Sequence, residues 1–180
     1  MAATIPIKNI TEPYVVEDNE RHTFLVNRRA FVDPNVLAQE QAAIFDKCWL
    51  YIGHESEIPN NEDFLTRAVG GRELIFVRGK DGTARAFFNT CPHRGAMVCR
   101  EKKGKGKMFR CFYHAWTFDL EGKLIQRPEA ERYSEAAQEG MHNLVQVAKL
   151  EQYRGLYFVN FDDAAIDLVT YLAGAVEYID

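Results

Sequence analysis

The sequence predicts a mostly β domain, built from short antiparallel strands with one helix near each end. Short runs of β-branched and aromatic residues alternate with glycine-containing turns between residues 49 and 161. Helical signals lie outside this region, at an Asp-Pro pair on one side and an apolar periodicity over 163–179 on the other. Two Cys/His segments follow predicted strands, so we expect a rigid β scaffold that carries two functional loops.

The N-terminal part is expected to be an irregular arm followed by a helix. Residues 1–32 are polar with scattered aromatic residues. Asp33 is a favourable N-cap, and Pro34 then occupies the first helical position. Apolar residues recur with helical spacing as far as about residue 47, so the predicted helix spans 34–47.

The predicted strands are delimited by turn residues. Gly70-Gly71, the segment 79–82 and Glu121-Gly122 are turn signals. Residues 127–141 are polar and predict a long loop, and an amphipathic helix is expected over 163–179. Strands are expected at 49–53, 64–69, 73–78, 84–89, 107–110, 116–119, 123–125, 144–150 and 156–161.

Composition indicates a protein of the cytoplasm. A chain of 180 residues can bury one well-formed core. No apolar run is long enough to span a membrane, and the N-terminus lacks the apolar stretch of a secretory signal. Four cysteines fit a reducing compartment, and no disulfide is expected between Cys48 and Cys99, which lie outside the loops.

The candidate metal ligands are two thiols and two imidazoles. Cys91 and His93 form Cys-x-His, and Cys111 and His114 form Cys-x-x-His. A matched set of two cysteines and two histidines is what a Rieske 2Fe–2S cluster requires, because two imidazoles replace two thiolates on one iron. Zinc is the weaker alternative, since zinc modules usually begin with two cysteines two to four residues apart.

Two segments, 91–95 (Cys-Pro-His-Arg-Gly) and 111–116 (Cys-Phe-Tyr-His-Ala-Trp), resemble a known family. This is the Rieske domain in the large (alpha) subunit of bacterial aromatic-ring-hydroxylating oxygenases. Residues 49–59 are similar to the same family, and the resemblance covers roughly residues 30–180. It implies the Rieske fold of antiparallel sheets with two cluster-binding loops. It also implies an N-terminal arm over 1–32, a Rieske domain over 33–162, and a helix over 163–180 that leads toward a catalytic domain missing from this chain.

The resemblance implies how the cluster is held. Cys91 and Cys111 would bind one iron, and His93 and His114 the other. Ala115 departs from the family, which mostly has glycine there, and Trp116 is expected to pack beneath the cluster loop. Respiratory Rieske proteins have an extra cysteine in each loop and a serine after the second histidine. Their absence here predicts a low reduction potential, near roughly −150 mV.

The resemblance also implies the function, which is to pass single electrons from a ferredoxin or reductase to the mononuclear iron of a ring-hydroxylating oxygenase. The expected partners are that donor, the neighbouring alpha subunit and a beta subunit. The remaining His22, His54 and His142 are scattered, with His22 and His142 expected at the surface. They do not form the paired-histidine motif of a mononuclear iron site. No catalytic residue is therefore expected in this chain, and the aromatic substrate cannot be identified.

Two alternatives remain open for the whole chain, a self-contained Rieske electron carrier and a zinc-binding module. The segment 100–110 also has two interpretations. Its six basic residues and one acid give it a charge of +5 in a chain of net charge −4. It is expected to be a solvated hairpin tip, or else a docking surface for an acidic electron donor. Nucleic acid is not an expected partner, because the chain is acidic overall. A membrane is not expected either, because no apolar run is long enough to span one.

Overall fold

The computed structural model describes residues 13–129 and 142–180. The chain divides into two compact units, residues 1–45 and 46–180. Most of the loop expected at 127–141 lies outside the described residues. Among the residues that are described, none of the helices has the length and hydropathy to span a bilayer.

The first unit contains a hairpin that the sequence did not predict. Strand β1 (Val15–Asp18) pairs antiparallel with β2 (Thr23–Val26), and α1 (Arg29–Val32) follows. The expectation of irregular chain over 1–32 was therefore wrong for this part. No glycine marks this turn in the sequence. The residue with the left-handed backbone conformation is His22, whose φ is 52°.

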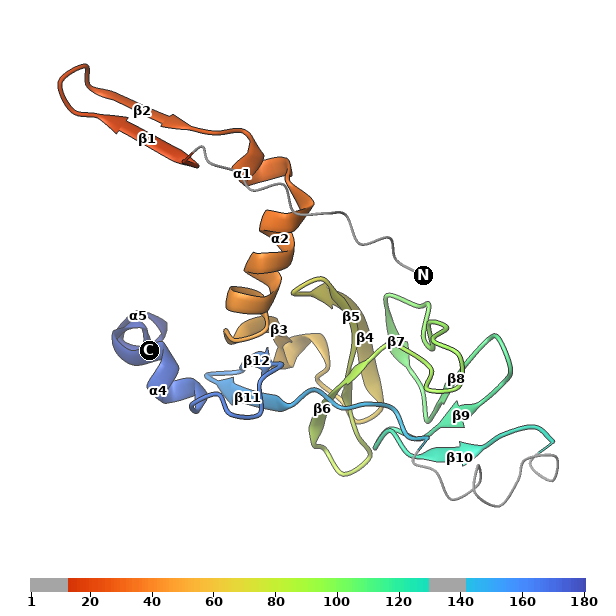
Figure 1. Ribbon diagram of the computed structural model, residues 1–180. Coiled ribbons are helices and arrows are strands. Elements are labelled where there is room, and N and C mark those ends of the chain that lie inside the picture. The colour runs from red at the N-terminus through yellow and green to blue at the C-terminus, as the bar shows by residue number, and fades with distance from the viewer. Residues whose placement is uncertain (1–12, 130–141) are drawn as a thin grey trace. The chain divides into compact units, whose positions relative to one another are not determined.

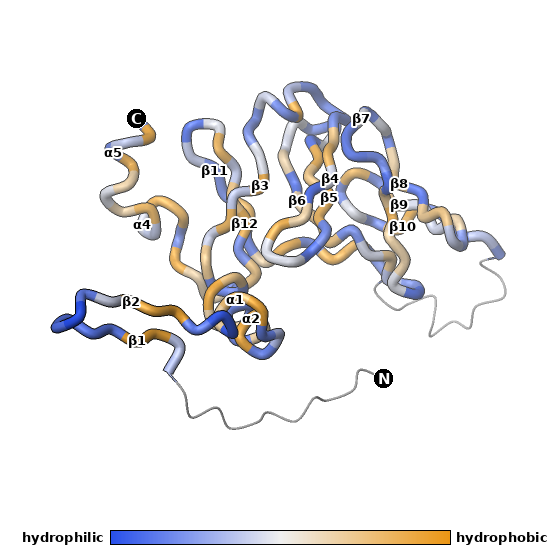
Figure 2. The backbone as a smooth tube through the Cα atoms, turned by 90° about the horizontal axis from the view of Figure 1, so that it is seen from above, coloured by the Kyte–Doolittle hydropathy of each residue, from blue (hydrophilic) through white to orange (hydrophobic). Residues whose placement is uncertain are grey.

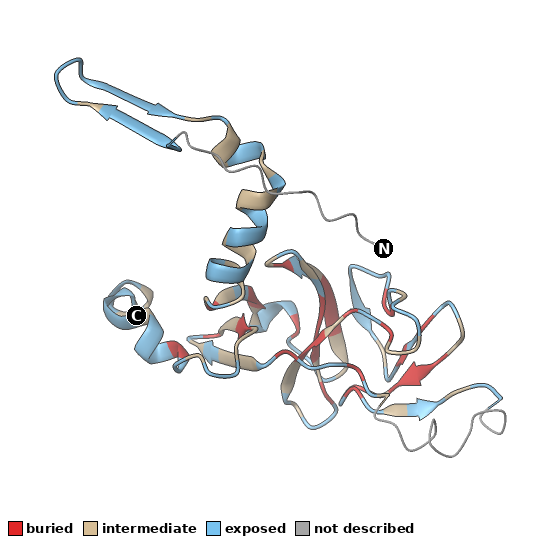
Figure 3. Cartoon of the chain, viewed as in Figure 1, coloured by how far each residue is buried: buried red, intermediate tan, exposed pale blue. Residues whose placement is uncertain are grey.

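The predicted helix is present but ends earlier. It consists of α2 (Pro34–Glu40) and a π-helical turn, η1 (Gln41–Phe45). Asp33 caps it as expected, accepting a hydrogen bond of 2.9 Å from the backbone N–H of Asn35. Figure 3 shows only exposed and half-buried residues in the described part of this unit, which therefore has no buried core of its own.

The second unit is organised around a four-stranded antiparallel sheet. Its order is β6 (Ala84–Phe88), β5 (Arg72–Arg78), β4 (Asp63–Val69) and β7 (Lys103–Lys105) (Figure 1). The basic segment is therefore not a hairpin tip, because Lys103 pairs with Leu65 at the edge of the sheet. Lysines on an edge strand discourage further strand pairing, which gives these charges a structural role.

Two smaller sheets complete this unit. One has the order β11 (Lys149–Tyr153), β12 (Leu156–Asn160) and β3 (Leu50–His54), and the other β10 (Leu124–Gln126), β9 (Thr117–Phe118) and β8 (Phe109–Arg110). The strand expected at 144–150 was largely wrong, since β11 begins only at Lys149. Residues 144–148 contribute one isolated bridge, between Gln146 and Phe87.

The C-terminal helix is shorter and less regular than predicted. It begins at Leu168 rather than at 163 and consists of α4 (Leu168–Leu172), the 3-10 turn η4 (Ala173–Ala175) and α5 (Val176–Ile179). Ala173 has φ of 45°, which interrupts the helical conformation. Leu168 is the buried residue in these three elements, so packing holds only the first turn in place.

The central sheet is buried on both faces. Ile75, Val77 and Phe87 point into one core cluster, which also contains residues of β8 and β9 and of the two Cys/His loops. The alternate residues Leu74 and Phe76 point into a second cluster with residues of β3 and β12. Burial on both sides explains the continuous apolar run in β5, part of which is orange in Figure 2.

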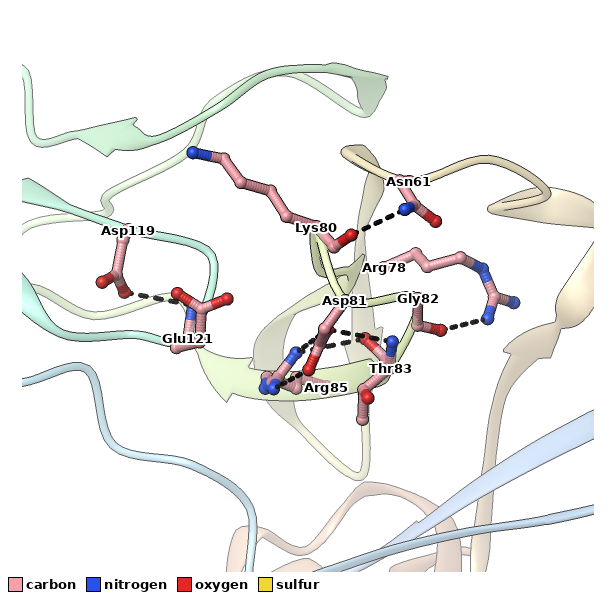
Figure 4. A network of polar contacts seen from close by, with 9 residues as sticks. All are labelled: Asn61, Arg78, Lys80, Asp81, Gly82, Thr83, Arg85, Asp119 and Glu121. Atoms are coloured by element: carbon pink, nitrogen blue, oxygen red, sulfur yellow. Dashed lines mark hydrogen bonds and ion pairs between the residues drawn. The ribbon is translucent and has the colours of Figure 1, made fainter.

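The turn before β6 is fixed by side chains (Figure 4). Asp81 accepts hydrogen bonds of 2.9 and 2.8 Å from Arg85 and one of 3.0 Å from the N–H of Thr83. Arg78 donates to the carbonyl of Gly82 at 2.9 Å. These contacts fix the beginning of β6, the strand whose other end leads into the first Cys/His loop.

Glu57 links β3 to the central sheet. It lies in the 3-10 turn η2 (Glu55–Glu57), accepts a hydrogen bond of 2.9 Å from the N–H of His54, and pairs with Arg67 of β4 at 2.6 Å. Arg67 also donates to the carbonyl of Ile52 at 2.6 Å. The hydrogen bond from Arg67 lowers the pKa of Glu57, so the carboxylate form stabilises the folded state.

We predict that Glu57→Gln lowers the free energy of unfolding at pH 7 by at most about 1 kcal/mol, because the pair is a third exposed. Since the pKa of Glu57 is lowered on folding, its contribution is complete above its unfolded pKa and disappears as the pH falls through the folded value. Urea unfolding of variant and wild type should therefore converge between pH 7 and pH 3. A difference that does not change with pH, or an equal effect of the exposed neighbour variant Glu55→Gln, would contradict this role.

Candidate metal centre

The four predicted ligands lie on two loops at the ends of core strands. The first loop follows β6 and is closed at its base by a bridge between Thr90 and Met97. The second loop connects β8 to β9. Both predicted cysteines belong to the first core cluster.

The two loops have the same pattern of backbone hydrogen bonds. In the first loop, the N–H of Gly95 donates to the carbonyl of Cys91 at 2.8 Å, and the N–H of Cys91 donates to the carbonyl of Ala96 at 2.7 Å. In the second loop, the N–H of Ala115 donates to the carbonyl of Cys111 at 2.9 Å, and the N–H of Cys111 donates to the carbonyl of Trp116 at 2.8 Å. The loops are therefore equivalent frames, although the histidine follows the cysteine at a different spacing in each.

The two cysteines form an inner pair. Cys91 is 2% exposed and Cys111 is 1% exposed, and both are free thiols. Burial raises the pKa of Cys91, and a hydrogen bond with Cys111 raises it further. The structure thus brings together two thiols that were 20 residues apart in the sequence, and a bound cation would favour their thiolate forms.

The two histidines form an outer pair. Their ring centroids are 4.6 Å apart, with an angle of 69° between the ring planes. Burial lowers the pKa of His93, as does the nearby His114, which favours the neutral imidazole that metals bind. The Nδ1 atom of His93 is buried and has no hydrogen-bond partner among the described residues. Such an atom is costly unless something binds it, and a metal ion is a suitable partner.

These four side chains form two pairs, which is the ligand set of a cluster of two irons. Within the described residues, no three or more His, Cys, Asp or Glu side chains are grouped to hold one metal ion. A Rieske cluster needs only two protein ligands on each iron, two thiolates on one and two imidazoles on the other. An inner pair of thiols beside an outer pair of imidazoles has this arrangement.

Comparison with protein families agrees with the geometry. The family model described as "Rieske [2Fe-2S] domain" matches residues 48–153, which contain both loops. The chain belongs to the Rieske domain family. The match includes the sheets that carry the loops, so this Rieske domain comprises most of the second unit.

The curated relatives of this Rieske domain include alpha subunits of dioxygenases. Biphenyl 2,3-dioxygenase subunit alpha of Rhodococcus jostii is 37% identical over 166 residues, covering 92% of this chain and 36% of the relative. Toluate 1,2-dioxygenase subunit alpha of Pseudomonas putida is 34% identical over 169 residues, covering 92% of this chain and 37% of the relative. The chain thus spans little more than a third of the length of these relatives.

Solved structures show the same fold. A naphthalene 1,2-dioxygenase mutant bound to phenanthrene matches with a TM-score of 0.80 and 34% identity, over 86% of this chain and 35% of the other. A quaternary ammonium Rieske monooxygenase, CntA, matches with a TM-score of 0.75 and 35% identity, over 84% of this chain and 42% of the other. Similar Rieske domains therefore occur in enzymes whose named substrates are very different.

Asn89 supports the first loop of the Rieske domain and was missed by the sequence analysis. Its side chain is buried and makes three hydrogen bonds to the backbone, donating to the carbonyl of Cys99 at 2.7 Å and accepting from the N–H groups of Val98 and Cys99 at 3.1 and 2.8 Å. It thereby ties the two ends of the loop together. An asparagine that follows a strand often caps a turn, but only the fold reveals a partner ten residues away.

The surface above the loops is aromatic and cationic. The guanidinium carbon of Arg100 lies 3.3 Å from the ring centroid of Phe112, so a residue that follows the first loop contacts a residue of the second. Phe112 and Tyr113 are 55% and 54% exposed. The remaining thiols have other partners. Cys99 donates a hydrogen bond to the carboxylate of Glu101, and burial raises the pKa of Cys99 to about 11. Cys48 is hydrogen-bonded to Tyr171.

We predict opposite stability effects for equivalent substitutions in the two loops. Ala115 and Gly95 occupy the same position in their loops, with φ of 56° and 71°. Ala115→Gly removes the strain of a side chain in this conformation and should raise the free energy of unfolding, by up to about 1 kcal/mol. Gly95→Ala should lower it by about 1 kcal/mol through strain alone, since a Cβ there meets no atom within 4 Å.

Urea unfolding of the two variants beside the wild type measures both effects. Destabilisation by Ala115→Gly, or an unchanged stability in Gly95→Ala, would show that the loops are not equivalent frames.

Proposed function

We propose that Cys91, His93, Cys111 and His114 bind a Rieske-type 2Fe–2S cluster, with the thiolates on one iron and the imidazoles on the other. The observation that supports this assignment is the separation of the donors into an inner thiol pair and an outer imidazole pair on equivalent loops. The buried, unpartnered Nδ1 of His93 further supports it, among the described residues.

When bound, the cluster supplies a one-electron acceptor and donor. The chain's own residues determine its surroundings. The cysteines, with the core behind them, exclude water from the inner side. His93 and His114 are only half-buried, so we expect the electron to leave through their side of the cluster. The ring nitrogen of each histidine that does not bind iron can hold or release a proton, which couples the charge of the site to pH.

For the whole protein, we propose electron transfer from a ferredoxin or reductase to the mononuclear iron of an aromatic-ring-hydroxylating oxygenase in the cytoplasm. The named alpha subunits among the relatives support this function. The catalytic iron would belong to a neighbouring alpha subunit, and a beta subunit is a further candidate partner. Domain limits of 1–32, 33–162 and 163–180 remain part of the proposal, and the family match over 48–153 falls inside the middle one.

Absorption and EPR spectra of the anaerobically purified chain test the cofactor directly. We predict a brown protein with two irons and two sulfides per chain that bleaches with dithionite and then gives a rhombic signal with an average g below 2. Cys91→Ser and His114→Ala should lose this signal, and Cys99→Ser should keep it. A colourless protein with one zinc and no sulfide would refute the proposal and favour the zinc-binding module.

We predict a reduction potential at the low end of the Rieske range, near roughly −150 mV. The second loop has Phe112 and Tyr113 where respiratory Rieske proteins have a cysteine, and Ala115 and Trp116 where they have a serine, so we expect fewer hydrogen bonds to the cluster. Fewer hydrogen bonds to the cluster stabilise its reduced form less, which lowers the reduction potential. A redox titration measures the potential, and a value above zero would contradict this explanation.

A second part of the proposal concerns the donor. Lys102, Lys103 and Lys105 are exposed on and beside the edge strand β7, and the chain continues from there into the loop that carries Cys111 and His114. An acidic donor would be attracted to this surface, and the attraction would weaken with salt. The protection of a sheet edge explains the same lysines without any partner, so an experiment must separate the two.

Charge reversal at Lys102, Lys103 and Lys105 should slow reduction by an acidic ferredoxin at least about tenfold at low salt, and should flatten the salt dependence. Lys123→Glu, at an exposed turn outside the segment, is the matched control and should change the rate little. Stopped-flow absorbance measures the rate. Unchanged kinetics in the triple variant would leave edge protection as the role of these charges.

A further inference from the structure

Trp116 contacts the opposite ligand loop. Its indole ring lies flat on the imidazole of His93, with ring centroids 4.6 Å apart and an angle of 3° between the planes. Trp116 follows the second loop, whereas His93 belongs to the first. Trp116 was expected to pack beneath the cluster loop, and it packs on a candidate ligand of the other loop.

The indole is itself held firmly. Trp116 is 2% exposed and belongs to the core cluster that contains both cysteines and Phe118. Its ring also meets His142, with ring centroids 5.4 Å apart and an angle of 74° between the planes. His142, which was expected at the surface, is therefore half-buried against this indole. Because its own neighbours fix the indole, the plane of Trp116 can determine the plane of the ring stacked on it.

His93 needs such support. A metal-binding histidine is usually oriented by contacts of the ring away from the metal-binding nitrogen, and the ring contacts found for His93 among the described residues are those with Trp116 and His114. Of these two contacts, the stack on Trp116 is the one with a ring that belongs to the core cluster. His114 is supported differently, by the exposed ring of its neighbour Tyr113 at 3.8 Å and 36°.

We propose that Trp116 is a positioning residue, which fixes the imidazole plane of His93 so that its buried Nδ1 faces the cluster. The inference rests on the proposed function, since it takes His93 as an iron ligand. It assigns the two histidines different supports, a ring anchored in the core for His93 and a surface ring for His114. The orientation of His93 then depends on contact between the two loops.

The test compares Trp116→Phe, which keeps a flat ring, with Trp116→Leu, which keeps apolar burial without one. Phe118→Leu is the control, because Phe118 is fully buried in the same cluster and no ring contact with His93 is found for it among the described residues. The measurements are the g values and line widths of the reduced protein, and the rate at which a chelator removes iron. Phe118→Leu shows how far a loss of packing in the same cluster changes these quantities without loss of the stack on His93.

We expect Trp116→Leu to shift and broaden the EPR signal and to lose iron at least tenfold faster than the wild type. Trp116→Phe should restore the signal, and Phe118→Leu should keep wild-type g values. Wild-type g values in Trp116→Leu, or no rescue by Trp116→Phe, would overturn the proposal. If Trp116→Leu does not fold, Trp116→Met takes its place. A wild-type protein without the mixed-ligand signal would instead refute the proposed function.

Discussion

The site depends on the way each ligand loop closes on its own cysteine. In both loops the cysteine carbonyl accepts a hydrogen bond from the residue four positions later, and the cysteine N–H donates to the residue after that. These bonds join backbone groups, so they do not depend on the intervening side chains. They give Cys91 and Cys111 equivalent positions on one core cluster, while the histidines, two and three residues further on, reach the outer side. The division into inner thiols and outer imidazoles follows from this frame.

The central sheet determines where the two ligand loops lie. Its two buried faces divide the second unit into two clusters, and the ligand loops complete one of them. Burying one large apolar side chain contributes about 1.5–3 kcal/mol, whereas an exposed ion pair contributes about 0–1 kcal/mol. The packing of residues such as Phe87 and Phe118, both almost fully buried, therefore determines where the loops lie. Surface pairs such as Asp81 with Arg85 fix single turns, such as the one before β6.

Sequence patterns predicted the parts that depend on local signals. Strands β4, β5, β6 and β12 were found because short apolar runs end at turn residues, and Asp33 with Pro34 marked the start of α2. The hairpin β1–β2 was missed because His22 rather than glycine forms its turn, and the C-terminal helix was overextended because Ala173 breaks an otherwise helical pattern. The ligand candidates were evident from spacing, but the supports provided by Asn89 and Trp116 were not. Those contacts join segments that only the folded sheet brings together.

We propose that two imidazoles and two thiolates from equivalent loops bind one cluster, and pulsed EPR can count the imidazoles. The reduced protein is grown with ¹⁵N-labelled histidine in an otherwise unlabelled chain. We expect couplings from two histidine nitrogens, one of which disappears in any variant of His93 or His114 that still holds iron. A reduced cluster that shows no coupling to labelled histidine, or coupling to only one, would contradict this ligand set.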